Sequence, residues 1–130
     1  MIQSLSQAML EQFARNEKYF AEAPEVFFQA WKRGVQIAGY QWFGDGTREG
    51  FARAASKWDL CPAVPRLDNA LGVLSSGERM FFSAMVSVYD SREGGAMLRH
   101  CGFEGLSDLG CLDLEQRQVI TDLLLHYNGW

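Results

Sequence analysis

Three cysteines and two histidines carry the side chains best suited to covalent chemistry in this chain. Cys101 or Cys111 could act as a nucleophile if His126 removed its proton and Asp113 oriented the imidazole ring, which is what nucleophilic catalysis requires. Sequence spacing alone does not assemble such a set, because a catalytic triad is defined by its geometry. A small hydrolase or thiol enzyme built on Cys101, Cys111 and His126 is therefore one alternative function.

The patterns that hold metals or phosphates in other proteins are absent from this sequence. It contains no Cys-x-x-Cys or His-x-x-x-His pair, and the neighbours His100 and Cys101 would point about 100° apart on a helix. The glycine-containing segments 44–46 and 94–95 do not match a phosphate-binding loop, and no predicted strand precedes them. The acidic segment 89–95 has too few oxygen ligands for calcium. We expect no metal and no cofactor.

Large aromatic residues are concentrated in one part of the chain, and they are its most distinctive feature. They are Trp31, Tyr40, Trp42, Phe43 and Trp58. Aromatic residues dominate protein cores, and they are also enriched where proteins bind each other. We expect most of them to fill the core between the first three helices. Glycines flank the stretch from Tyr40 to Phe43, so we place this stretch at the surface. The predicted partner-binding residues are Tyr40, Trp42, Phe43, Arg53 and Lys57.

Basic residues near these aromatics suggest a second alternative, a nucleic-acid-associated regulator. They are Lys32, Arg33, Arg48, Arg53 and Lys57. Stacking rings combined with cations would suit a single nucleic-acid strand. Acidic residues interleave with them, however, and twelve Lys and Arg against sixteen Asp and Glu give a net charge of −4. Phosphates repel such a chain at long range, so we expect a solvated helix face and no nucleic acid.

Apolar residues recur at intervals of three and four along most of the chain, which is the period of an amphipathic helix. The pattern predicts a first helix from about Ile2 to Ala21, with an apolar face of Ile2, Leu5, Met9, Phe13 and Phe20. Pro24 suits the first turn of a second helix, ending near Ala38, that would pack antiparallel on the first. Further helices are predicted over residues 47–58 and 66–74, with an extended proline-containing connector at 61–65.

The second half of the chain carries local signals for helix starts and ends. Three pairs have the spacing of a capping box: Ser75 with Glu78, Asp90 with Glu93, and Asp113 with Gln116. Gly102 suits the left-handed position that ends a helix. Segment 78–90 is apolar nearly all round, which is typical of a helix in the middle of a bundle. The sequence therefore predicts an all-α bundle of six or seven helices around a buried central helix at about 78–90.

The length of 130 residues fits one compact domain, and the connector 61–65 is the one candidate sub-boundary. The first residues lack the basic start and continuous apolar stretch of a secretory signal. No apolar run approaches the roughly 18 residues of a membrane span. Three scattered cysteines do not form a disulfide framework. We therefore expect a protein of a bacterial-type cytoplasm that makes no membrane contact.

A well-capped helical fold without a convergent polar site favours a non-enzymatic role. The leading hypothesis is a helical protein-interaction or regulatory module that binds another protein or itself. No residue pattern assigns it a small-molecule ligand.

Overall fold

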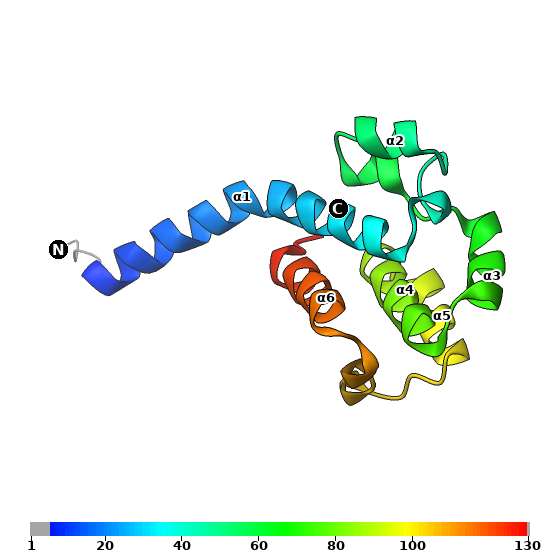
Figure 1. Ribbon diagram of the computed structural model, residues 1–130. Coiled ribbons are helices and arrows are strands. Elements are labelled where there is room, and N and C mark those ends of the chain that lie inside the picture. The colour runs from blue at the N-terminus through cyan, green and yellow to red at the C-terminus, as the bar shows by residue number, and fades with distance from the viewer. Residues whose placement is uncertain (1–5, 130) are drawn as a thin grey trace.

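The computed structural model describes residues 6–129, apart from the side chains of residues 64–68, and this part of the chain is all-α (Figure 1). Its α-helices are α1 (Gln7–Ala38), α2 (Arg48–Arg53), α3 (Val64–Val73), α4 (Ser76–Tyr89), α5 (Ser91–His100) and α6 (Leu114–His126). Its short 3-10 helices are η1 (Tyr40–Trp42), η2 (Lys57–Leu60) and η3 (Leu106–Cys111). The predicted fold class is confirmed. Strand-like pairing in the described residues is limited to one antiparallel bridge, between Phe43 and Pro62.

The chain departs from the sequence prediction at Pro24. This proline lies inside α1 and does not start a second helix, so the predicted antiparallel packing of two helices is wrong. A proline inside a helix costs about 3 kcal/mol. Beyond Pro24, however, α1 buries Phe27 and Trp31, and each such side chain contributes about 1.5–3 kcal/mol. Figure 1 shows α1 changing direction along its length, as a proline kink does. Ile2 and Leu5 lie outside the described residues.

The predicted central helix is confirmed as α4. Every residue from Met80 to Val86 is buried, and α1, α5 and α6 all pack against this helix. Its start is a capping box, in which the Ser75 hydroxyl accepts from the Glu78 N–H (3.3 Å) and the Glu78 carboxylate accepts from the Ser75 N–H (3.1 Å). Hydrogen bonding from Ser75 lowers the pKa of Glu78. Asp113 and Gln116 form the equivalent box at the start of α6.

Several helix boundaries also follow the local signals. Thr47 caps α2, but this helix ends at Arg53, well before the predicted Trp58. The connector is shorter than predicted, because α3 starts at Val64 with the second proline in its first turn. At the end of α5, Gly102 has a φ of 85°, and the following N–H of Phe103 donates to the Leu98 carbonyl (3.0 Å). The predicted left-handed helix ending is therefore confirmed.

The contact between α4 and α5 depends on Gly94. A Cβ atom at this position would overlap the backbone of Ser87 and Val86 on α4, whereas a Cβ at the neighbouring Gly95 would make one ordinary contact with Arg99. We expect Gly94→Ala to lower the free energy of unfolding by about 2–3 kcal/mol, because the two helices must separate. Gly95→Ala, the matched control, should raise it by about 0.5–1 kcal/mol through higher helix propensity. Urea denaturation measures the free energy of unfolding of both variants. Equal changes in Gly94→Ala and Gly95→Ala would contradict the close packing of α4 and α5 at Gly94.

Candidate functional site

The aromatic stretch from Tyr40 to Phe43 forms part of the core wall. Its backbone pairs with the connector, since the Ala63 N–H donates to the Trp42 carbonyl (3.0 Å). Phe43 is 1% exposed, and its ring lies edge-on to the Trp31 ring with the centroids 5.7 Å apart. The predicted surface position is therefore wrong for Phe43, which is enclosed by the protein's own core.

Tyr40 and Trp42 are half-buried and lie at the edge of the same cluster. The Tyr40 ring is 6.4 Å from the Phe51 ring of α2, measured between centroids. The buried indole N–H of Trp42 makes no hydrogen bond with the described residues. The flanking glycines serve backbone turns, because Gly39 and Gly44 have φ values of 115° and 59°. They do not indicate exposure, and partner binding by Tyr40 and Trp42 stays a prediction.

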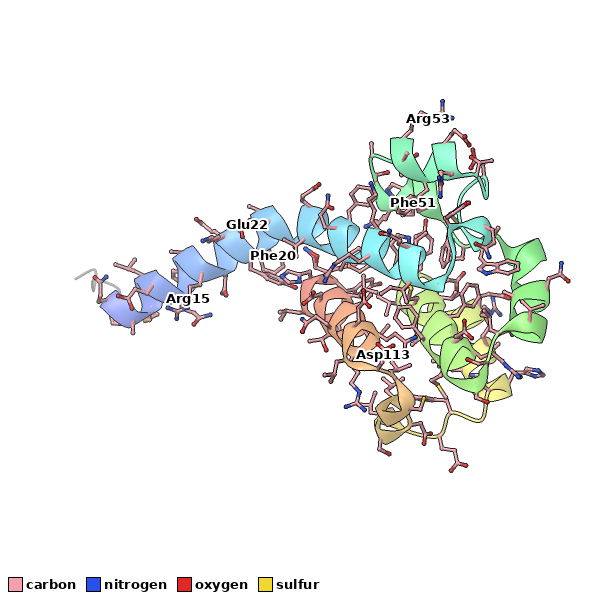
Figure 2. All side chains as sticks on the ribbon, viewed as in Figure 1. Arg15, Phe20, Glu22, Phe51, Arg53 and Asp113 are labelled. Carbon is pink, nitrogen blue, oxygen red and sulfur yellow. The ribbon has the colours of Figure 1, made fainter. Side chains whose placement is uncertain are left out.

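Basic residues of the predicted nucleic-acid face rest against aromatic rings. The Lys32 ammonium lies 5.2 Å from the centroid of Phe51, and that of Lys57 lies 5.1 Å from the centroid of Trp58. Both distances are typical of cation–π contacts. Burial lowers the pKa of Lys57. Arg53, at the end of α2, is exposed (Figure 2). Partner binding by Arg53 and Lys57 stays a prediction.

The residues of the predicted thiol site lie in different places. Asp113 caps the start of α6 and His126 ends it, so at 1.5 Å per residue they are about 20 Å apart. Cys111 is exposed at the end of η3, next to the start of α6 (Figure 2 labels Asp113). Cys101 lies at the end of α5 with its Sγ 3.5 Å from the Ser83 hydroxyl. The structure does not bring the nucleophile, the base and the orienting carboxylate together.

Other site chemistry finds little support in the described residues. Among the side chains that the structure describes, no group of three or more His, Cys, Asp or Glu residues converges as a metal site would. None of the described helices combines the length and apolar character needed to cross a bilayer. An open groove of about 500 Å³ between α3, α4 and α5 is lined in part by Arg79, Glu93 and His100. These side chains carry charges of both signs, and they do not define one class of ligand.

The feature that sequence reasoning missed is the N-terminal part of α1, which projects away from the other helices (Figure 1). We call residues 7–22 the arm. Almost all of its residues are exposed, including large apolar side chains: Met9 (47%), Leu10 (47%), Phe13 (50%) and Phe20 (58%). The apolar period did predict this face. The sequence prediction covered this face with a second helix packed antiparallel on the first. In the structure, residues 7–38 form one continuous helix, so no part of this segment folds back over the face.

The exposed face of the arm continues the buried face of the same helix. Phe13, Phe20 and Phe27 are seven residues apart, so they lie along one side of α1. Phe27 is 2% exposed, and its ring lies beside the rings of Trp31 and Tyr127 and under the Lys57 ammonium. Within the arm, the side chains on the same side are about half exposed. The arm therefore presents to solvent a face of the kind that normally lies in a core.

Two contacts fix the base of the arm to the end of α6. The Tyr19 hydroxyl donates to the Leu125 carbonyl (2.7 Å), and the Tyr19 ring stacks on His126 with the centroids 6.0 Å apart. Further along, the Arg33 guanidinium on α1 pairs with the Asp122 carboxylate on α6 (2.6 Å). In Figure 2, Phe20 lies near this junction, where the arm leaves the end of α6. These contacts set the direction in which the arm projects.

Comparison of the chain with models of protein families, with curated proteins and with solved structures finds no match in any of the three.

The ion pair between Arg33 and Asp122 makes a pH-dependent contribution to the junction. Burial opposes ionisation of Asp122, but hydrogen bonds from Arg33 and Gln118 outweigh it and hold the pKa of Asp122 below its usual 3.8. Because the pKa of Asp122 is lower in the folded chain than in the unfolded chain, its carboxylate stabilises the folded state at pH values above the unfolded pKa. The contribution disappears as the pH falls through the folded value.

We expect Asp122→Asn to lower the free energy of unfolding by about 0.5 kcal/mol near neutral pH, the modest size typical of an exposed ion pair. The difference from the unmodified chain should shrink as the pH falls below 3.8 and the Asp122 carboxylate takes up a proton. Urea denaturation near neutral pH and below pH 3.8 measures this. If Asp122→Asn lowered the free energy of unfolding equally at both pH values, the charge of Asp122 would contribute nothing to stability.

Proposed function

We propose that this chain is a cytoplasmic, non-enzymatic protein-interaction module whose binding element is the arm of α1. The observation that carries the proposal is the stripe of Met9, Phe13 and Phe20, which has the spacing of a core face and stays about half exposed. Contiguous apolar surface on a folded protein is typical of an interaction site. Helices that bind through such a stripe place their anchor residues three, four or seven positions apart.

Energetic reasoning supports the same role. A helix of this length is marginally stable alone in water, and most helical stability in proteins comes from packing of an apolar face. The arm lacks such packing within the described chain, so it gains stability when its stripe is covered. Glu11, Arg15 and Lys18 lie on the opposite side of the helix from the stripe. The surface that meets the partner is therefore apolar and the outer surface stays solvated.

A cytoplasmic, non-enzymatic role is consistent with the other residues considered. Cys61, Cys101 and Cys111 are free thiols, as suits a reducing compartment. Cys111 lies just before the start of α6 and His126 lies at its end, so their arrangement gives no support to a thiol enzyme built on that pair. Lys32 and Lys57 rest on aromatic rings, which leaves less free positive charge for a nucleic acid.

Photo-crosslinking tests the proposal directly. A photoreactive phenylalanine analogue is placed at position 13, on the stripe, and in a separate chain at position 14, where the exposed Ala14 lies off the stripe. Each chain is produced in cells and irradiated. We expect a covalent adduct to a protein, either a second copy or another chain, from position 13 and not from position 14. Mass spectrometry of the adduct identifies the protein.

Adducts of equal yield from both positions would indicate random encounters. The absence of any protein adduct from position 13 would contradict the proposed function.

A further inference from the structure

We infer that the arm binds the arm of a second copy of this chain, in antiparallel orientation. This inference rests on the proposed function and names the partner of the same surface. Residues Met9, Phe13, Asn16 and Phe20 are separated by intervals of four, three and four, which is the seam of a coiled coil. The seam continues through Ala23 into the buried half of α1, where helix packing already covers it.

The seam is complementary to itself when two arms run in opposite directions. If they cross between residues 14 and 15, Phe13 comes level with Asn16 of the second copy, and Phe20 comes level with Met9. Each aromatic ring then faces a smaller or more flexible side chain. A two-fold axis repeats every contact, so no part of the seam is left over.

Charge does not decide the orientation, because Glu11, Arg15 and Lys18 lie on the side of the helix away from the seam. A parallel pair would bring the two sets of packed helices to the same end, whereas the antiparallel pair keeps them at opposite ends.

The surface available is sufficient for a reversible dimer. Met9, Leu10, Phe13 and Phe20 are each about half exposed, so each offers on the order of 100 Å². With the flanking side chains, two arms would bury on the order of 1,000 Å² in total, which is the lower end of specific interfaces. We therefore expect a dimer that forms in the micromolar range and dissociates on dilution.

Analytical ultracentrifugation of the full chain across the micromolar range tests this inference. We expect the unmodified chain to move from 14.7 kDa towards twice that mass as its concentration rises. Phe13→Glu should weaken dimerisation at least about 100-fold, because it buries an unpaired charge in the seam. Ala14→Glu adds the same charge off the seam and should leave dimerisation unchanged. Intrinsic tryptophan fluorescence, to which the buried Trp31 contributes, verifies that each variant keeps its fold.

Cysteine crosslinking tests the orientation. In chains whose three native cysteines are replaced by alanine, Met9→Cys and Phe20→Cys are made separately. An antiparallel pair forms disulfides between the two variants when they are mixed and none when either is oxidised alone. A parallel pair gives the reverse, and that result would overturn the orientation.

A chain that stays monomeric throughout, or a dimer that Phe13→Glu does not weaken, would overturn the second copy as the partner. These outcomes are distinct from failure of the proposed function. A monomeric chain that still forms an adduct to a different protein from position 13 keeps the interaction role and loses only the self-association.

Discussion

The fold depends on the burial of one indole ring. Trp31 is fully enclosed, its N–H donates to the Leu60 carbonyl (2.9 Å), and its ring packs against Phe43 and Tyr89. A buried donor without a partner costs about 1–3 kcal/mol, so Leu60 and the segment around it must be in place when Trp31 is buried. Through this one side chain, α1 is joined to η2, to the turn at Phe43 and to the end of α4.

Local signals were enough to predict most helix starts, because a cap involves residues only three positions apart. Ser75 with Glu78 and Asp113 with Gln116 are examples, and the all-round apolar character of α4 was likewise sufficient to place it at the centre. Pro24 shows where such reasoning fails. Its sequence context suits a helix start and a helix kink equally, and the choice is made by tertiary burial of the residues that follow.

The candidate site was harder to predict, because exposure depends on which elements cover a face. The apolar period identified Met9, Phe13 and Phe20 as one stripe, but nothing local revealed that no other helix covers it. Conversely, the glycines beside Tyr40 and Phe43 suggested a surface loop, although they serve backbone turns that lead into the core. The predicted site that combined His126 with Cys101 or Cys111 is not assembled in the structure, because sequence spacing carries no information about the distance between these side chains.

Pro24 also lies between the exposed arm of α1 and the packed half of the helix. Its nitrogen carries no hydrogen, so the ladder of backbone hydrogen bonds is interrupted between the arm and the packed half of the helix. Helical order in the arm can therefore be lost and regained while the core around Trp31 stays intact, as happens in proteins whose segments open independently. In the proposed complex, an arm that melts and reforms would search a larger volume than a rigid rod, and it would lose its conformational entropy only on binding.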